Sequence, residues 1–236
     1  MAAAVGEALE GAIPREAMKP PAFSLWRFAR AFPGPHARWY VTGKVASDPL
    51  YPAVRRALEG TAAPLLDIGC GMGVLSFYLR AQGFLHPIHG MDYDFRKIDV
   101  AQQVLQNSAA ENLSFSHGDA REGLPPHQGS VTILDILQYF PSEEQARLLS
   151  AAASRIRPDG VLVIRSGLDS PGWRFQLTRW CDGMANRLRW MQGLPVHYPT
   201  AESLTATLTA AGLTGTLQPL HGHTPFNNWL AVFRRA

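Results

Sequence analysis

Apolar residues along the chain fall into short runs of strand length that alternate with segments of helical period. A continuous apolar run of four to eight residues between turn-forming residues is typical of a buried strand. Five such runs lie within the first 166 residues. We predict strands within residues 63–69, 86–92, 112–119, 130–137 and 157–166.

Segments with apolar residues on one helical face separate these runs. The helix after the first strand is expected to end at Gly83. Ser142 and Gln145 have the spacing of a capping box, and Thr200 and Gly212 suit the start and the end of a later helix. The predicted helices occupy residues 73–83, 95–109, 142–156 and 200–213.

The last two apolar runs, residues 214–222 and 228–236, are joined by a short turn-rich link. A link of this length predicts an antiparallel pair. The alternation before them predicts a parallel α/β sheet, because parallel strands need crossover connections that are usually helices.

Two segments stand outside the alternation. Residues 1–20 have no persistent period and are expected to form a flexible arm, with one domain over residues 21–236. Within this domain, the pattern of residues 21–60 predicts a helical cap of two helices. Residues 167–199 lie between the fifth predicted strand and the helix that is expected to follow it. We interpret the second segment as a helical, lid-like insertion over the edge or mouth of the sheet.

Composition narrows the function classes. A length of 236 residues with 46% hydrophobic and 17% charged residues is that of a globular domain. No apolar stretch is long enough to span a membrane, the N-terminus is no convincing secretory signal, and two cysteines are too few for a disulfide framework or a metal cluster. These features predict a cytoplasmic protein without a metal. The net charge of +3 does not choose among nucleic acid, membrane and acidic protein partners.

Three glycines follow the first predicted strand in the sequence "LLDIGCGMGV". Gly69, Gly71 and Gly73 have the spacing G-x-G-x-G, whereas the dinucleotide-binding fingerprint G-x-G-x-x-G needs a glycine at Val74. Asp67 lies two residues before the first glycine. A carboxylate there would oppose a pyrophosphate but attract an ammonium group, so the ligand is expected to be a nucleoside that carries a cationic group.

Two further acids follow the next two strands. Asp92 lies 19 residues after Gly73, at the place where an acid accepts hydrogen bonds from ribose hydroxyls. Asp119 follows the third strand, where it can accept a hydrogen bond from the exocyclic amino group of adenine. Together with Asp67, the acids describe one ligand with an amine, a ribose and an adenine.

This ordered set resembles the class I S-adenosylmethionine-dependent methyltransferases. The resemblance rests on "LDIGCGMG", "GMDYD", "HGDA", "ILDILQYFP" and "IRPDGVLVIR", and it covers residues 65–166 and the final hairpin. It implies a seven-stranded, mostly parallel, doubly wound sheet with an antiparallel last strand, and S-adenosyl-L-methionine as the cofactor. It also implies that Asp67 and the glycines hold the methionine end, Asp92 the ribose, and Asp119 with Ala120 the adenine. Tyr93 is a candidate contact of the adenine ring.

Methyl transfer from a sulfonium depends mainly on alignment of the acceptor with the methyl group, so a general base is useful but not obligatory. Asp135, near the end of the fourth strand, is a candidate base or a cofactor contact. His221 and His223 belong to the link between the last two strands, and histidine titrates near neutrality. If the sixth strand is parallel to the others, this link opens on the cofactor side, and both histidines become candidate bases.

The expected acceptor is a fairly apolar small molecule, aromatic or acyl in type. The segment "DILQYF" lacks the proline pair of enzymes that methylate amines of DNA bases or glutamine, which disfavours nucleic acid. An RNA or protein methyltransferase, motivated by the arginines, and a non-catalytic binding module that kept the fold remain the alternatives.

Aromatic and basic residues in the insertion and the N-terminal segment bear on the acceptor. In a helix, Trp173, Trp180, Met184 and Leu188 fall near one side. We interpret this side as the face of an amphipathic lid over an apolar pocket; membrane-surface attachment, a dock for an acidic carrier protein and simple core packing are the alternatives. The N-terminal segment is expected to close the same pocket with residues that include Trp26, Trp39, Tyr40 and Lys44.

Overall fold

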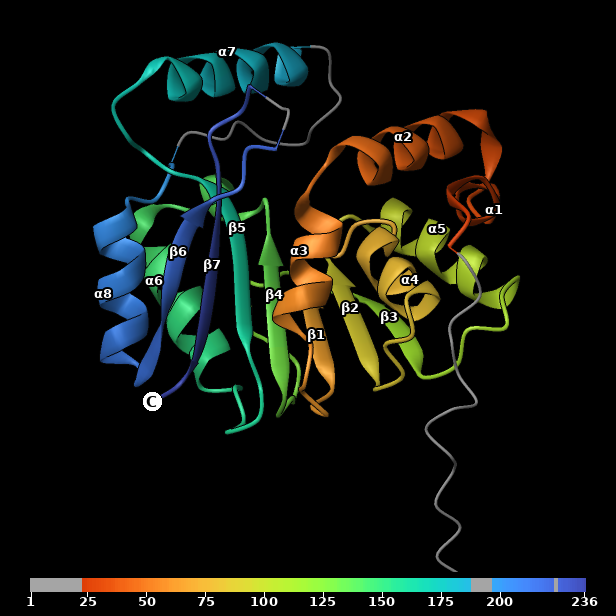
Figure 1. Ribbon diagram of the computed structural model, residues 1–236, viewed down its shortest axis with the longest axis horizontal. Helices are drawn as coiled ribbons and strands as arrows, with labels where there is room; N and C mark the ends of the chain where they lie inside the picture. The colour runs from red at the N-terminus through yellow and green to blue at the C-terminus, as the bar shows by residue number, and fades with distance from the viewer. Residues whose placement is uncertain (1–22, 188–196, 223–224) are drawn as a thin grey trace, which may run out of the picture.

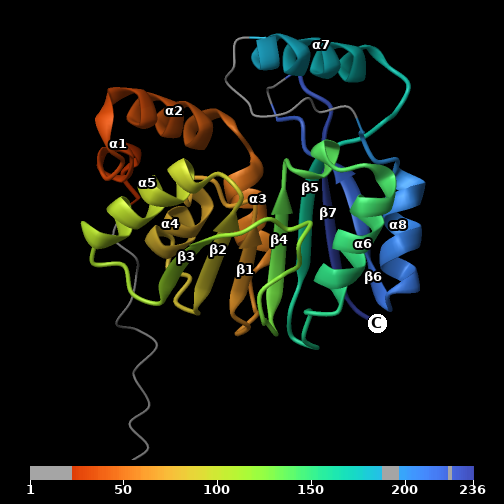
Figure 2. The same cartoon turned by 180° about the vertical axis from the view of Figure 1, so that it is seen from behind.

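The computed structural model describes residues 23–187, 197–222 and 225–236, and in them a seven-stranded sheet carries helices on both faces (Figures 1 and 2). The arm predicted at residues 1–20 and the end of the predicted insertion at residues 188–196 lie outside the described residues. The strands are β1 Leu65–Ile68, β2 Ile88–Asp92, β3 Leu113–His117, β4 Ser130–Leu134, β5 Leu162–Gly167, β6 Leu213–Pro219 and β7 Asn228–Arg235. The helices are α1 Leu25–Arg30, α2 Gly34–Ser47, α3 Leu50–Ala57, α4 Val74–Ala81, α5 Phe95–Gln106, α6 Ser142–Ala153, α7 Trp173–Arg187 and α8 Ala201–Ala210, with a short 3₁₀ helix, η1, at Leu137–Tyr139.

The strand order is β3-β2-β1-β4-β5-β7-β6. The first five strands pair in parallel, and β7 lies antiparallel between β5 and β6. Strand β6 therefore runs in the same direction as the first five. This arrangement confirms the predicted fold class.

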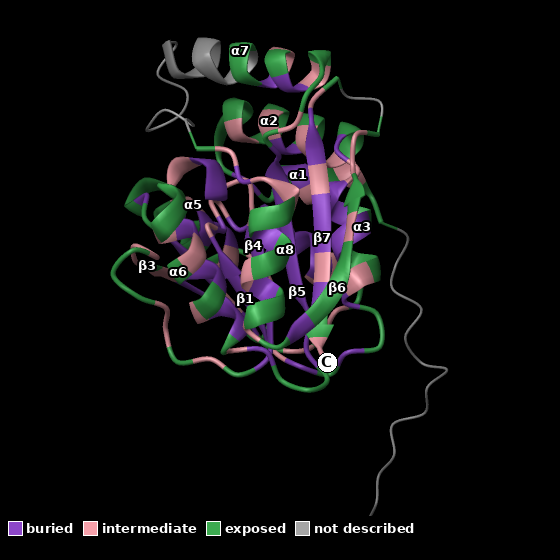
Figure 3. Cartoon of the chain, turned by 90° about the vertical axis from the view of Figure 1, so that its left-hand side faces the viewer, coloured by how far each residue is buried: buried purple, intermediate pink, exposed green. Residues whose placement is uncertain are grey.

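Each face of the sheet packs into its own hydrophobic cluster. Alternate side chains of a strand point to opposite faces, so Leu65 packs with helices α3, α4 and α5, while Leu66 packs with α6 and α8. Figure 3 shows the central strands buried between helices whose outer surfaces are exposed, whereas the edge strand β6 is mostly exposed. Helices thus cover both faces of the sheet, and the edge at the carboxyl ends of its parallel strands remains for the binding of a ligand.

The strand order reverses between β1 and β4, which both lie in the middle of the sheet. In an α/β sheet, such a switch point opens a crevice at the carboxyl ends of the two strands. Helices α2 and α7 lie over this end of the sheet, α2 towards β1 and β2, and α7 towards β5 and β7 (Figures 1 and 2).

The N-terminal cap contains three helices, and the expectation of two was wrong. The link "FPGP" ends within α2, which begins at Gly34 with Pro35 in its first turn, a position where proline is well tolerated. The helical material then breaks at Asp48 and Pro49, and the Oδ1 atom of Asp48 accepts a hydrogen bond from the N–H of Leu50 at the start of α3. Asp48 thereby links α2 to α3.

The predicted helix ends are correct where the cap is local. Thr200 and Ser203 form a capping box at the start of α8, and Gly212 follows its end with a φ of 77°. The capping box predicted for α6 was wrong. Gln145 instead donates to the carbonyl oxygens of Leu137, Phe140 and His197, because its side chain is buried against the preceding turn.

Across the described ranges, no helix has both the length and the apolar character needed to cross a membrane.

Candidate active site

A cavity of about 1070 Å³ opens at the switch point of the sheet. Pockets for one drug-sized ligand measure about 300 to 1,000 Å³, so this cavity has room for two small molecules side by side. One end is lined by the segments that follow β1, β2 and β3, and the other by α2, α7 and the ends of β4 and β5. We call these the donor end and the acceptor end.

The glycine loop after β1 forms the floor of the donor end. Gly69, Gly71 and Gly73 all have positive φ, in the region that only glycine adopts at low cost. A Cβ atom on Gly69 would lie 2.6 Å from Cγ2 of Ile136. A side chain at position 69 would therefore strain the backbone and collide with Ile136, in the segment after β4.

Asp67 lies at the end of β1, is only 2% exposed and lines the cavity. Its neighbour in register on β4 is Thr132, whose hydroxyl donates to Oδ1 of Asp67 at 2.7 Å. Burial raises the pKa of Asp67 to about 7, the Thr132 hydrogen bond opposes this rise, and the charge of Asp92 adds to it. A buried carboxylate of this kind gains most from a cationic ligand.

Asp92 lies at the end of β2 and has two backbone donors. Its Oδ2 atom accepts from the N–H of Gly71 at 2.8 Å, and its Oδ1 atom accepts from the N–H of Asp94 at 2.9 Å. Each carboxylate oxygen has a second acceptor position, so Asp92 can still receive a ligand hydroxyl. Asp92, which is expected to bind the ribose, thus also holds the glycine loop in place through the N–H of Gly71.

Asp119, Ala120 and Tyr93 meet at the outer part of the donor end, where all three line the cavity. The carboxylate of Asp119 accepts from the backbone N–H and the guanidinium of Arg121, which lowers the pKa of Asp119. Tyr93 is 43% exposed. The structure therefore brings seven of the eight residues predicted for the cofactor to one cavity, with Arg121 as an additional partner. The exception is Gly73, which is the N-cap of α4 and does not line the cavity; a Cβ atom on it would lie 2.7 Å from the ring of Phe115.

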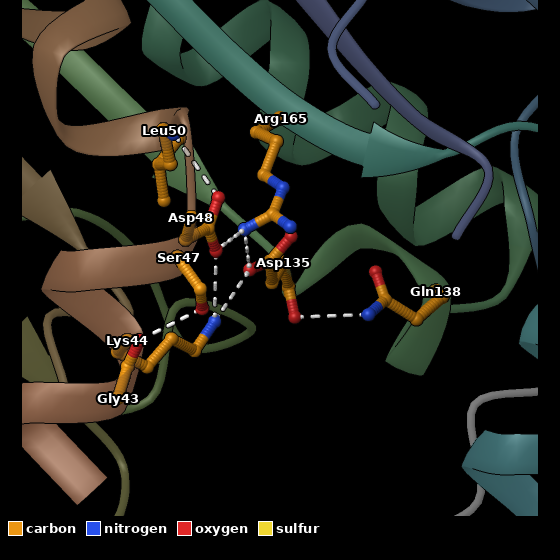
Figure 4. A network of polar contacts seen from close by, with 8 residues as sticks. All are labelled: Gly43, Lys44, Ser47, Asp48, Leu50, Asp135, Gln138 and Arg165. Carbon is orange, nitrogen blue, oxygen red and sulfur yellow. Dashed lines mark hydrogen bonds and ion pairs between the residues drawn. The ribbon is translucent and has the colours of Figure 1, made fainter. Parts of the chain in front are cut away.

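A network of charged side chains forms the acceptor end (Figure 4). Arg165 on β5 is 5% exposed, and its Nη1 atom donates to Oδ2 of Asp135 at 2.7 Å and to Oδ2 of Asp48 at 2.9 Å. Lys44 Nζ lies 3.3 Å from the same Asp48 oxygen and 3.8 Å from the same Asp135 oxygen. Two cations and two anions thus tie α2 to the ends of β4 and β5.

The network also sets the protonation of its two cations. Burial and the charge of Arg165 oppose the charged form of Lys44, but Asp135, together with Tyr40 and Asp48, raises its pKa above the ordinary value. For Arg165, burial is likewise outweighed by Asp135 and Asp48, which raise its pKa. Both side chains are therefore cationic at neutral pH.

Asp135 itself has a φ of 60°, which is uncommon for a residue other than glycine. Its carbonyl oxygen accepts a hydrogen bond from Nε2 of Gln138 at 3.0 Å. The Oε1 atom of Gln138 is buried and has no hydrogen-bond partner within the part of the chain that the structure describes. Because Gln138 also lines the cavity, a donor on a bound ligand can satisfy this atom.

Sequence reasoning missed Asp48 and Arg165. Asp48 precedes a proline and looks like a turn residue, and its role depends on a contact 117 positions away in sequence. Arg165 gave one signal: it is a charge within the apolar run "VLVIRS", and a charge inside a strand is rarely buried unless it is paired.

His221, one of the two histidines predicted as bases, is not brought to the cavity. His221 is absent from the residues that line it and packs its ring against Trp229, at 6.3 Å between ring centroids. His223 lies outside the described residues. The link after β6 does start on the carboxyl side of the sheet, as the parallel direction of β6 requires, but His221 faces β7 there.

The predicted orientation of α7 was wrong for its two described tryptophans. Trp173 and Trp180 are 64% and 62% exposed, whereas Phe175 and Thr178 are buried. Thr178 lines the cavity, so the inner face of α7 is the side of Phe175 and Thr178. The side chains of Met184 and Leu188 lie outside what the structure describes.

The N-terminal cap closes the cavity with one face of α2. The lining residues of α2 are His36, Ala37, Tyr40 and Lys44. These residues recur with helical spacing, so they share one side of the helix. Trp26 and Trp39, which were expected to close the pocket as well, are 65% and 70% exposed and do not line it.

The methyltransferase domain family matches residues 45–218, which is most of the chain. The chain belongs to this family. The matched region holds the glycine loop, the three donor-end acids and Asp135, and it begins one residue after Lys44. The resemblance drawn from the sequence motifs is thereby confirmed.

The relatives of this methyltransferase-family chain include the ubiquinone biosynthesis O-methyltransferase of Aromatoleum aromaticum, 33% identical over 99 residues. This match covers 41% of the chain and 40% of the relative's length, so it spans well under half of either protein.

Solved structures show the same fold at lower identity. Magnesium protoporphyrin IX methyltransferase from Synechocystis, solved with bound SAH, has a TM-score of 0.63 at 19% identity, with 90% of this chain and 93% of that chain covered. The pyocyanin biosynthetic protein PhzM has a TM-score of 0.64 at 17% identity, with 91% and 62% covered. At these identities, the likeness establishes the fold alone.

Proposed function

We propose that the protein is an S-adenosylmethionine-dependent methyltransferase that acts on a fairly apolar small molecule. The observation that carries the proposal is the donor end of the cavity, where a buried acid, a glycine loop and two further acids meet in the order of the ligand's parts. Membership of the methyltransferase domain family supports it.

The donor end fits S-adenosylmethionine in charge and shape. Asp67 is a buried carboxylate whose described side-chain partner is the neutral hydroxyl of Thr132, so the ligand's ammonium would supply the missing positive charge. The loop at Gly69 leaves no room for a Cβ atom, as expected where a backbone must approach a ligand closely. Asp92 would accept from the ribose hydroxyls, and Asp119 with Ala120 and Tyr93 would surround the adenine.

When bound, S-adenosylmethionine supplies an electrophilic methyl group on a sulfonium. The chain's own residues then have to place the acceptor in line with that methyl group and keep water away. Alignment of this kind contributes on the order of 7 to 11 kcal/mol to a reaction barrier. We assign the alignment of the acceptor to the walls of the acceptor end, where apolar residues such as Leu50, Phe140 and Phe226 line the cavity.

Within the acceptor end, we assign Lys44 to the acceptor's reacting oxygen. Its side chain is 32% exposed, whereas that of Arg165 is 6% exposed and held by two carboxylates, so Lys44 is the cation of this network that a ligand can reach. An ammonium at this place stabilises negative charge on an oxygen that is about to be methylated. Oxygen as the methylated atom also agrees with the names of two curated relatives, which are O-methyltransferases.

Asp135 takes a positioning role in this proposal. Its Oδ2 atom is shared by Arg165 and Lys44, so its carboxylate holds the two cations in place at the cavity wall. Its backbone carbonyl orients Gln138, whose Oε1 atom is left for a ligand. An acceptor with an acidic hydroxyl, such as a phenol, would release its proton to water beside the Lys44 ammonium before the transfer, so a separate general base is then unnecessary. The oxygen–methyl bond would form as the sulfur–methyl bond breaks, and S-adenosylhomocysteine would leave.

The test is transfer of a labelled methyl group. Purified protein is incubated with S-adenosylmethionine labelled in the methyl group and with a panel of apolar phenols, quinols and carboxylic acids; a total RNA sample and a protein extract serve as the competing acceptors. We expect label in the organic extract. Label that appears only in RNA or protein would support the alternative function and contradict this proposal, as would the absence of any transfer to the panel.

A further inference from the structure

Tryptophan side chains stand on the outside of the three helices α1, α2 and α7. Of the five tryptophans that the structure describes, four are more than 60% exposed, and each of the four belongs to one of these helices. Exposed large aromatic residues gathered on one part of a surface mark a binding site for another molecule. The four are Trp26, Trp39, Trp173 and Trp180.

Helix α7 separates its aromatic side from its cavity side. Trp173 and Trp180 are seven residues apart and therefore lie on the same side, two turns from each other. Among the side chains of α7 whose burial is described, at residues 173–180, those of Phe175 and Thr178 are buried, and Thr178 lines the cavity. The helix forms the outermost layer over the carboxyl ends of the strands (Figures 1 and 2), so the tryptophan side faces away from the protein body.

Arginines accompany these tryptophans. The guanidinium of Arg30 lies 4.4 Å from the ring centre of Trp26, and that of Arg174 lies 4.8 Å from the ring of Trp173. The segment 23–47, which contains α1 and α2, has no aspartate or glutamate. Aromatic rings beside arginines on the outer side of surface helices are typical of helices that lie in the interface of a lipid bilayer. A bilayer with anionic headgroups complements this charge.

We propose that the outer sides of α1, α2 and α7 form a membrane-binding face that holds the protein on an anionic phospholipid surface. The face consists of the four exposed tryptophans together with Arg27, Arg30, Arg38, Arg174 and Arg179. Because the inner sides of α2 and α7 line the acceptor end, the cavity lies directly behind the lipid. An apolar acceptor dissolved in the bilayer then reaches the cavity without crossing water.

Vesicle co-sedimentation tests the membrane-binding face. Full-length protein is mixed with vesicles of phosphatidylcholine alone, or of an equal mixture of phosphatidylcholine and phosphatidylglycerol. We expect binding to the mixed vesicles that weakens as salt is added. The variant Trp173→Ala/Trp180→Ala is expected to bind at least about ten-fold more weakly. The matched control is Leu85→Ala, since Leu85 is 51% exposed but lies before β2, at the opposite edge of the sheet.

The charge contribution is tested separately. Arg30→Gln is expected to lower the affinity for the mixed vesicles about five-fold, which corresponds to one arginine near an anionic surface. Arg147→Gln, on the exposed side of α6, is expected to leave it unchanged. Binding of wild-type protein to neutral and anionic vesicles alike would contradict the assigned role of the arginines.

The proposal is overturned if the wild-type protein does not bind the mixed vesicles, or if the double tryptophan variant binds them as well as the wild type. Binding to an acidic acyl carrier protein that the double variant loses, without vesicle binding, would also overturn it in favour of a protein partner. Calorimetry with S-adenosylhomocysteine on the same variants keeps the two proposals apart. The double variant should retain wild-type affinity and melting temperature, because neither tryptophan lines the cavity.

Discussion

The donor and acceptor ends of the cavity are built in different ways. The donor end comes from three successive strand ends between Asp67 and Arg121, and its lining includes three glycines, Gly69, Gly71 and Gly118, which present only backbone. The acceptor end is assembled from α2, β4, β5, α7 and the segment before β7, and its polar part is a network of side chains. The two ends therefore make different demands on the sequence.

A site built from backbone depends on glycines and on a few acids at fixed places, so its requirements are local in the sequence. A site built from distant side chains depends on the fold to bring its members together. The donor end therefore specifies one ligand through a recognisable motif, whereas the acceptor end can change with single substitutions while the fold persists.

The largest effect is expected from breaking the acceptor-end network at its buried cation. Arg165→Met leaves Asp48, which is 9% exposed, with Lys44 as its remaining ion-pair partner. Loss of one member of a buried ion pair costs about 3 to 5 kcal/mol of stability, so the free energy of unfolding should fall by about 3 kcal/mol in a denaturant titration.

The control for this change is Arg147→Met, on the exposed side of α6, which should cost less than about 0.5 kcal/mol. Equal stability of the Arg165 variant and the wild type would mean that the network does not hold the cap to the sheet.

A smaller loss is expected from the glycine loop. Gly69→Ala places a Cβ atom against Ile136 and forces positive φ on alanine, so it should cost about 2 kcal/mol of stability and weaken binding of S-adenosylhomocysteine at least about ten-fold. Gly60→Ala measures the cost in stability of positive φ alone, because Gly60 has a φ of 81° and no atom lies close enough to contact an added Cβ atom. It should cost about 1 kcal/mol, with the affinity unchanged. Similar affinities for the two variants would show that the donor end tolerates a side chain at Gly69.

The smallest effect on the donor end is expected from Lys44→Met. The ion pairs of Arg165 with Asp48 and Asp135 remain, so affinity for S-adenosylhomocysteine should stay within about two-fold of wild type. Turnover of the acceptor found in the labelling screen should fall at least about ten-fold in kcat/KM, since the ammonium no longer stabilises the reacting oxygen. A matched variant, Arg55→Met, removes an exposed cation of α3 and should alter neither quantity. A parallel fall in donor affinity would contradict the separation of the two ends.

The sequence was sufficient to predict the sheet, its antiparallel last strand and the donor-end residues, because these depend on apolar runs, glycines and strand-end acids that lie close together. It did not predict the Arg165 network, since Asp48, Asp135 and Arg165 are 30 or more positions apart. It also misplaced the tryptophans of α7. Helical spacing predicts that Trp173 and Trp180 share a side, but it does not say whether that side faces the cavity or the surroundings.

Asp67 offers the most direct test of the account, because the proposed function assigns it to the ammonium group of the ligand. Its pKa of about 7 lies above the ordinary value. The unliganded protein therefore loses stability as the pH rises from about 4 through about 7, and a cationic ligand gains affinity over the upper part of this range as the carboxylate ionises. Asp67→Asn should remove both effects.

The measurement is calorimetric titration with S-adenosylhomocysteine at pH values of about 6 and about 7.5. The carboxylate is mostly protonated at the lower pH and mostly ionised at the higher, so we expect the affinity of the wild-type protein to rise several-fold. Asp67→Asn should bind more weakly at the higher pH and should show no such rise. Absence of binding to the wild type, or the same affinity for both proteins at both pH values, would contradict the account.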